Sequence, residues 1–177
     1  MSEMPDSLAP AELSSPAGGS EQTLVGEVRR TIDDRWRLSL PKEFAAEIAD
    51  ENDETIVVKE RYGCLSLWKA SQWRSRFDAG LAVIEQKIRA ERLAQRWGEV
   101  QRLGRLVSTR ARPVKLAGRS RLVLPDGFRD FLNVPAGGEL VVVGALVCVE
   151  LWNPELWIEQ LKGDMPDFNE LFQQLSA

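Results

Sequence analysis

The sequence predicts an α+β fold in which two copies of a small β-α-β module interleave into one β-barrel with pseudo-twofold symmetry, joined by a helical connector. Three observations support this prediction. One residue pattern occurs twice, alternating apolar residues flank a short helix in each copy, and a long helical stretch separates the copies. A module of about 45 residues is too small to bury a stable core alone, so the copies are expected to pair.

The repeat comprises residues 32–73 and 116–157. IDDRWRLSLPKEF aligns with LAGRSRLVLPDGF, and CLSLWKASQW aligns with CVELWNPELW. Between these segments Val57-Val58 is matched with Val141-Val142, and every matched pair is 84 residues apart. A single register kept without a gap indicates an internal duplication.

Each copy is expected to contain the same elements in the same order. In the first copy these are a strand at 27–32, a polar turn, a strand at 36–40, a short helix opened by Pro41, a hairpin pairing 55–59 with 64–68, and a helix from Ser71. In the second copy they are a strand at 112–117, a polar turn, a strand at 120–124, a short helix opened by Pro125, a hairpin pairing 139–143 with 147–152, and a helix from Pro154. Gly144 and Ala145 are expected to form the second hairpin turn. Asn153 is a suitable N-cap for the last helix.

Five segments follow from this order. They are a disordered N-terminal tail at 1–23, a first module at 24–72, a helical connector at 73–108, a second module at 109–157, and a C-terminal helix and tail at 158–177. The connector carries a helical apolar stripe of Leu81, Ile84, Ile88, Leu93, Trp97, Val100 and Leu103. Its heptads are irregular, so we expect the stripe to pack on the modules or on a neighbouring subunit rather than form a free coiled coil.

The composition argues against an enzyme. The 177 residues include no histidine, which is the commonest general base and a leading zinc ligand. No nucleophile–base pair, glycine-rich phosphate loop or metal-ligand cluster is visible, so we expect no catalytic activity, no cofactor and no metal. Cys64 and Cys148 lie in apolar, strand-like runs and are expected to be buried free thiols, with a disulfide as the alternative.

No segment is expected to enter a membrane. No apolar run approaches the roughly 20 residues that a membrane span needs. The N-terminus lacks a basic segment followed by an apolar one, so a cytoplasmic location is expected.

Charge is distributed unevenly along the chain. The net charge is −4, but residues 1–23 carry −4, residues 110–121 carry +5, and residues from 122 onward carry −7. A basic patch between acidic surroundings is therefore expected, although the whole-chain value hides it.

The two polar turns hold the candidate binding residues. Their sequences are Asp-Asp-Arg-Trp-Arg at 33–37 and Ala-Gly-Arg-Ser-Arg at 117–121. Two arginines spaced by two in a strand project from one face, and guanidinium groups bind phosphate and read guanine edges. The candidate DNA-binding residues are Arg35, Arg37, Arg119, Arg121, Lys115 and Arg112, with Asp33 organising the first turn. Alternatively, these arginines are solvated or pair with Asp33 and Asp34.

The tryptophans allow two roles. Trp68, Trp73, Trp152 and Trp157 occupy equivalent places in the two copies, which favours core or subunit-interface packing over stacking on bases. Trp36 lies in the candidate binding turn. It is either an exposed recognition residue or a cap on the barrel.

This order of elements resembles the MraZ family, whose members carry two modules of the SpoVT/AbrB-like, swapped-hairpin class. The matching residues are Ile32-Asp33, Arg35, Arg37–Pro41, Arg121–Pro125, Val143-Gly144 and Glu150–Trp152, and the resemblance covers about 24–160. It implies a double-split β-barrel and a sequence-specific DNA-binding transcriptional regulator. It also implies a nucleoid-associated homo-oligomer, often a ring, that binds promoter-proximal direct repeats in double-stranded DNA upstream of division and cell-wall genes.

The sequence departs from the family pattern in both turns. The family has an acid at the start of the turn and a glycine just before the last arginine. Trp36 replaces the first glycine, while Ala117 and Ser120 replace the second acid and glycine. Glycine there supplies a backbone geometry that is costly for other residues. A second hypothesis is therefore an oligomeric interaction or assembly protein that has lost DNA binding.

Overall fold

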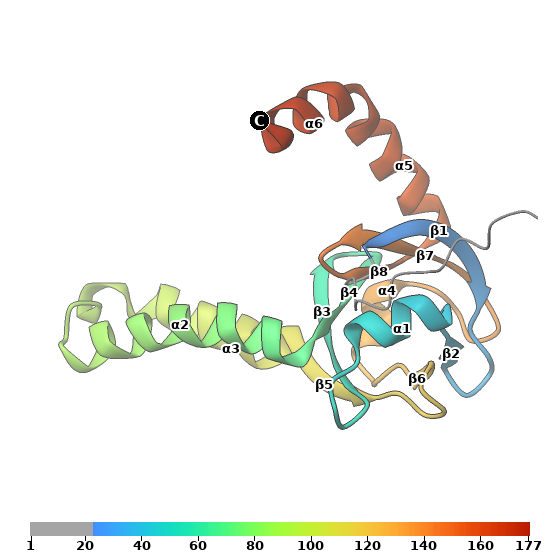
Figure 1. The fold of residues 1–177 in the computed structure, drawn as a ribbon. Coiled ribbons are helices and arrows are strands. Elements are labelled where there is room, and N and C mark those ends of the chain that lie inside the picture. Colours follow the sequence, from blue (N-terminus) through green and yellow to red (C-terminus); the bar gives the residue numbers. More distant parts are fainter. Residues whose placement is uncertain (1–22) are drawn as a thin grey trace, which may run out of the picture.

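The computed structural model describes residues 23–177, so the predicted N-terminal tail lies outside the described residues except for Thr23. The elements are β1 (Leu24–Thr31), β2 (Arg37–Ser39), α1 (Lys42–Ile48), β3 (Glu54–Arg61), β4 (Cys64–Lys69), α2 (Ala70–Arg89), η1 (Ala94–Arg96), α3 (Trp97–Arg110), β5 (Ala111–Lys115), β6 (Arg121–Val123), α4 (Phe128–Leu132), β7 (Glu139–Leu146), β8 (Val149–Trp152), α5 (Pro154–Asp164), η2 (Met165–Asp167) and α6 (Phe168–Ser176). Figure 1 shows a β-rich body from which a helical hairpin (70–110) and a C-terminal arm (154–177) project in different directions.

The two copies exchange strands. The larger sheet is antiparallel with the order β1-β7-β8-β4-β3-β5. Strand β1 of the first copy therefore pairs with β7 of the second, and β5 of the second copy pairs with β3 of the first. Strands β2 and β6 form a separate two-stranded antiparallel ribbon. Among residues 23–177 the strand pairing gives one open sheet and this ribbon, not the closed barrel that we expected.

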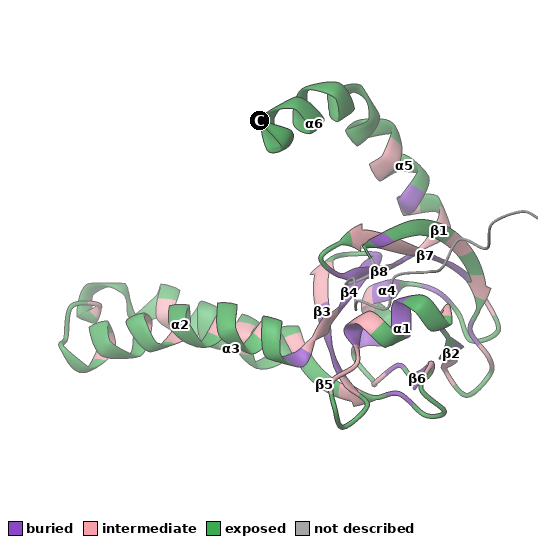
Figure 2. Cartoon of the chain, in the orientation of Figure 1, coloured by how far each residue is buried: buried purple, intermediate pink, exposed green. Residues whose placement is uncertain are grey.

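One main core lies inside the body, where both copies contribute equivalent residues. It includes the fully buried Ile32, Leu38, Leu122, Leu132 and Leu140. Burying such a side chain is worth about 1.5–3 kcal/mol. Figure 2 shows that buried residues gather in the body, whereas the hairpin and the arm are largely exposed.

The register of β3 differs from the gapless alignment. Val57 lies opposite Leu67, and Val142 lies opposite Leu151. Since the two leucines are 84 residues apart, the structural equivalent of Val57 is Val142, at an offset of 85. A β-bulge between Lys59 and Arg61 restores the offset of 84. The match of Val57-Val58 with Val141-Val142 was therefore wrong, because consecutive valines hide a one-residue shift.

The prolines begin their helices differently from our prediction. Pro41 is the N-cap of α1 rather than its first helical residue. Helix α4 begins only at Phe128, because Gly127 is its N-cap with a φ of 80° and the Phe128 N–H bonds the Pro125 carbonyl at 3.2 Å. The Asn153 prediction is confirmed, since its side chain accepts from the N–H groups of Glu155 and Leu156.

The turn of the second β-hairpin also lies later than predicted. The Ala145 N–H bonds the Cys148 carbonyl at 2.9 Å, and Leu146 has a φ of 64°. Gly144 instead lies within β7, where a Cβ would come within 2.7 Å of the Leu24 carbonyl carbon. Gly144 therefore permits the close approach of β1.

The connector folds back on itself. Helices α2 and α3 lie side by side in Figure 1, separated by a break at 90–96. Ile84, Leu93, Val100 and Leu103 line one groove between them, whereas Trp97 is exposed. The apolar stripe thus packs largely within the hairpin and not on the modules, which was one of the two expected arrangements; packing on a neighbouring subunit stays a prediction.

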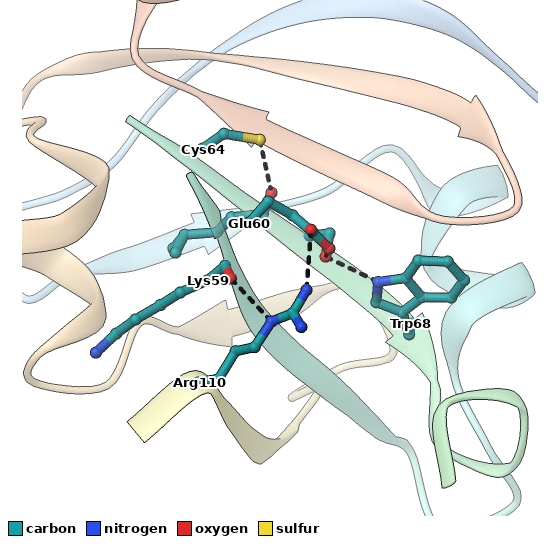
Figure 3. A network of polar contacts seen from close by, with 7 residues as sticks. Lys59, Glu60, Cys64, Trp68 and Arg110 are labelled. Atoms are coloured by element: carbon teal, nitrogen blue, oxygen red, sulfur yellow. Dashed lines mark hydrogen bonds and ion pairs between the residues drawn. The ribbon is translucent and has the colours of Figure 1, made fainter. Parts of the chain in front are cut away.

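Polar contacts attach the hairpin to the sheet (Figure 3). The Arg110 Nε donates to the Lys59 carbonyl at 3.3 Å, and its Nη2 lies 3.4 Å from the Glu60 carboxylate. Glu60 accepts from the Ser66 hydroxyl at 2.5 Å, and that hydroxyl accepts from the Trp68 indole at 2.8 Å. The base of the hairpin is therefore held in place.

The paired tryptophans pack at equivalent places in the two copies. Trp68 and Trp73 lie 5.9 Å apart between ring centroids, and Trp152 and Trp157 lie 5.5 Å apart. Trp152 and Trp157 are buried, and Trp68 and Trp73 pack against a smaller apolar cluster. This arrangement confirms the packing interpretation.

Two further sequence expectations concern the thiols and the helices. Cys64 and Cys148 are buried and free, as predicted. Burial raises the pKa of the Cys148 thiol to about 12 and also raises that of Cys64.

Within residues 23–177, none of the helices combines the length and the apolar character that crossing a membrane requires.

Candidate nucleic-acid interface

The β2–β6 ribbon has one buried and one exposed face. Leu38 lies opposite Leu122, and both side chains are fully buried in the main core. Side chains alternate between the faces of a strand, so the neighbouring residues point outward. These residues are Arg37, Ser39, Arg121 and Val123, which we call the ribbon face. Arg37 lies opposite Val123 and Arg121 opposite Ser39, so the two arginines occupy diagonal corners.

Asp33 organises the turn that leads into β2. Its Oδ1 accepts from the backbone N–H groups of Arg35 at 2.8 Å and Arg37 at 2.9 Å. Its Oδ2 accepts from the Arg37 Nε at 2.6 Å. The Arg37 backbone N–H chiefly holds the pKa of Asp33 below its ordinary value, and the Arg37 guanidinium adds to this effect. The charge of Arg37 is thus balanced by Asp33.

Trp36 covers the edge of the core. Its φ of 61° lies in the left-handed region, which costs a non-glycine residue roughly 1–2 kcal/mol. Its half-buried ring packs against the main core, and the Arg129 guanidinium lies 5.1 Å from the ring centroid. Its carbonyl accepts from the Leu124 N–H at 2.9 Å. Of the two roles considered for Trp36, the structure supports that of a cap on the core.

The turn that leads into β6 has a different shape. Ala117 and Arg121 exchange two backbone hydrogen bonds, of 2.6 and 3.0 Å. Gly118 and Arg119 have φ values of 58° and 69°. The left-handed residues therefore lie at 118–119, whereas the first turn has its left-handed residue at position 36.

The cations differ in their surroundings. Arg35 and Arg119 lie in the turns, so the expectation that each arginine pair shares one strand face was wrong. Arg35, Arg119 and Arg121 are exposed, and no ion pair or side-chain hydrogen bond is recorded for them within residues 23–177. The ribbon face and its two turns therefore present three unpaired guanidinium groups.

Arg112 and Lys115 lie outside the ribbon, on β5 of the larger sheet. Arg112 lies opposite Val57, and Lys115 lies opposite Glu54. The Glu54 backbone N–H chiefly holds the pKa of Asp50 below its ordinary value, and Lys115 contributes to this effect. Acidic neighbours thus offset the charge of Lys115 more than that of Arg121.

Comparisons with known proteins identify a family that this chain resembles. Residues 23–96 match the family model described as "MraZ protein, putative antitoxin-like". The curated relatives also extend over the second copy. A transcriptional regulator MraZ from Carboxydothermus hydrogenoformans is 26% identical over 151 residues, which is 85% of this chain and 95% of the relative. Over most of its length the chain is thus similar, at low identity, to proteins of the MraZ family.

Two further relatives named transcriptional regulator MraZ match a similar length of this chain. The transcriptional regulator MraZ from Caldicellulosiruptor saccharolyticus is 21% identical over 152 residues, covering 86% of this chain and 96% of the relative. The one from Moorella thermoacetica is 25% identical over 151 residues, covering 85% and 95%.

Arg129 is a residue of the interface that the sequence analysis missed. Its Nε donates to the Leu124 carbonyl at 2.7 Å, and its Nη1 lies 2.7 Å from Asp126. It also covers the Trp36 ring. The spacing of three residues between Asp126 and Arg129 was the available signal. Arg129 supports the end of the ribbon rather than facing a ligand.

A two-stranded ribbon with exposed arginines has a shape and charge suited to a DNA groove. It fits the major groove of B-form DNA, and guanidinium groups contact phosphates or the O6 and N7 of guanine. The ribbon face presents arginines toward both ends, and Arg35 and Arg119 extend the cationic surface into the turns.

Proposed function

We propose that this protein is an MraZ-type, sequence-specific DNA-binding transcriptional regulator that acts on its own operon of division and cell-wall genes. The observation that carries the proposal is the ribbon face, with Arg37 and Arg121 at diagonal corners above a fully buried pair of leucines. Its curated relatives are named transcriptional regulator MraZ.

The ribbon enters the major groove in this proposal. Arg121 and Arg119 carry most of the phosphate and base contact, since no carboxylate pairs with either among residues 23–177. Asp33 orients Arg37 and reduces its net contribution. Arg35 contacts phosphate from the first turn, while Arg112 and Lys115 act at longer range.

The proposal extends to the assembly. In this proposal the larger sheet and the ribbon are the two parts of a double-split barrel of the SpoVT/AbrB-like class, built from modules at 24–72 and 109–157 and packed on one core rather than closed by continuous strand pairing. Copies of the chain associate into a homo-oligomer, such as a ring, that binds promoter-proximal direct repeats. The protein acts in the cytoplasm, on the nucleoid.

Fluorescence anisotropy tests the proposal with DNA from upstream of the chain's own operon, at several salt concentrations. The variant changes Arg35, Arg37, Arg119 and Arg121 to Ala. A matched control changes Lys87, Arg89, Arg92 and Arg96 of the helical hairpin. We expect the first variant to lose binding and the control to retain most of it. Wild-type affinity in the first variant would contradict the site.

A second candidate is an oligomeric interaction or assembly protein that has lost DNA binding. Trp36 in the glycine position and the Asp33–Arg37 pair favour it, because they reshape the first turn and balance one arginine. This candidate requires an oligomer on a sizing column without salt-sensitive binding to any duplex. Retention of tight, sequence-specific binding would exclude it.

A further inference from the structure

The C-terminal arm leaves the body through a fixed base. The Trp157 indole donates to Glu27 at 3.0 Å, and Arg61 donates to Gln160 at 2.7 Å. These contacts hold α5 on the sheet. Every residue from Lys162 to Ala177 is exposed, so the outer part of the arm has little contact with its own chain.

One side of the outer arm is apolar. Met165, Phe168, Leu171, Phe172 and Leu175 follow the three- and four-residue spacing of one helix face. Their exposed fractions range from 49% to 83%. With Leu146 and Leu161 they line a single apolar groove. A contiguous exposed apolar patch of this kind marks a docking surface.

The charge of the arm restricts its partner. Residues 163–177 contain Asp164, Asp167 and Glu170 and no basic residue. None of these three carboxylates forms an ion pair within residues 23–177. Two arms placed against each other would bring like charges together, which is unfavourable. The charge therefore favours a basic surface over a second arm.

The helical hairpin offers such a surface. Residues 70–110 contain nine basic and four acidic residues, a net charge of +5. On α3, Leu103 and Leu106 are 38% and 54% exposed. Arg102 and Arg105 lie beside them, and within residues 23–177 neither has a recorded ion pair. The hairpin thus combines apolar contact area with unpaired positive charge.

The arm and the hairpin of one chain are held apart. Arg74 pairs with Glu54 at 3.0 Å and Arg110 with Glu60 at 3.4 Å, which fixes the hairpin base. Figure 1 shows the hairpin and the arm leaving the body in different directions. The hairpin that an arm reaches therefore belongs to another copy.

We propose that the outer arm of one copy docks on α3 of a second copy. Phe168, Leu171 and Phe172 cover Leu103 and Leu106, while Asp164 and Asp167, which flank the apolar side of the arm, face Arg102 and Arg105. The contact is head-to-tail, so successive copies close a ring or extend a filament. This inference rests on the proposed self-association and does not depend on DNA binding.

Mixing two full-length variants tests the contact. One variant carries Leu171→Ser and Phe172→Ser in the arm, and the other carries Arg102→Glu and Arg105→Glu in the hairpin. The arm variant keeps an intact hairpin, and the hairpin variant keeps an intact arm. In sedimentation velocity we expect each variant alone to be smaller than wild type, and the mixture to form a 1:1 complex. Absence of that complex from an equimolar mixture would overturn the proposal.

A charge exchange identifies the partner surface. Asp164→Arg with Asp167→Arg should dissociate the wild-type oligomer, and adding Arg102→Glu and Arg105→Glu in the same chain should restore it. Asn169→Ser with Gln173→Ser, on the opposite side of α6, is the matched control and should leave assembly unchanged. Failure of the exchange to restore assembly would contradict arm-to-hairpin docking.

The outcomes separate this inference from the proposed function. A wild-type chain that remains monomeric would contradict both the self-association and the docking. An oligomer that persists in the arm variant would contradict the docking alone. DNA affinity is measured separately by anisotropy, and its loss in ribbon-face variants that still assemble leaves the docking intact.

Discussion

The Nε of Arg37 lies 2.6 Å from the Oδ2 of Asp33, forming an ion pair within one turn. The duplication places Ala117 where Asp33 stands, so Arg121 has no corresponding carboxylate. The two halves of the ribbon therefore carry the same arginine but different net charge, and their contributions to DNA binding should be unequal.

Changing Asp33 tests how the first turn is built. Asp33→Asn retains an acceptor for the two backbone N–H groups but removes the ion pair with Arg37, so DNA affinity at low salt should rise and the stability at neutral pH should fall, although by less than in Asp33→Ala. Asp33→Ala also removes the acceptor for the two backbone N–H groups, so it should lower the free energy of unfolding further. Urea unfolding and anisotropy measure the two effects. Equal stability of Asp33→Ala and wild type would show that the turn does not need this carboxylate.

The same residue should make stability depend on pH. The folded-state pKa of Asp33 is lowered, so its stabilising contribution is present above the unfolded pKa of about 3.9. The contribution is lost as the pH falls through the lowered folded-state value. The stability difference between wild type and Asp33→Asn should therefore be constant near neutral pH and shrink below about pH 4.

The two faces of β6 should respond differently to truncation. Leu122→Ala removes a fully buried side chain and should cost about 2–5 kcal/mol. Val123 is 48% exposed on the ribbon face, so Val123→Ala should cost less than about 0.5 kcal/mol. Chemical unfolding measures both. A similar cost at the two positions would contradict the assigned register.

Two glycines should tolerate alanine to different degrees. A Cβ at Gly118 meets no atom within 4 Å, so Gly118→Ala should cost only the strain of its positive φ, about 1 kcal/mol. A Cβ at Gly144 meets the β1 backbone at 2.7 Å, so Gly144→Ala should cost more, about 3 kcal/mol. Thermal unfolding measures the order, and a reversed order would contradict the packing of β1 on β7.

Both thiols should resist modification in the folded protein. Cys64 and Cys148 are buried, and burial raises the pKa of each thiol. The thiolate is the reactive form, so a thiol reagent at pH 8 should react with neither until denaturant is added. Rapid reaction of one equivalent under native conditions would show that a cysteine is accessible.

Local patterns in the sequence predicted much of the ribbon. The alternation in RLSLP and RLVLP predicted strands at 36–40 and 120–124, where β2 and β6 lie, and the Asn153-Pro154 pair marked the start of α5. These features depend on side-chain spacing within a few residues. They can therefore be read without knowing the tertiary contacts.

Other features depend on contacts between distant residues. Trp36 adopts a left-handed conformation while its ring packs on the core under Arg129. The bulge in β3 is hidden by repeated valines. The connector reverses near Glu91, which has a φ of 55°, although that segment contains neither glycine nor proline. The spacing of residues in the sequence does not predict the Trp36 conformation, the β3 bulge or the reversal of the connector.

The most direct test of the DNA-binding account is the salt dependence of affinity for two paired variants. Log affinity falls by roughly 0.9 per log unit of salt for each phosphate that is neutralised. Arg119→Ala with Arg121→Ala should reduce the salt slope by about 1.8. Arg35→Ala with Arg37→Ala should reduce it less, since Asp33 balances Arg37. Unchanged slopes and affinities in both variants would contradict the assignment of the ribbon as the DNA-binding surface.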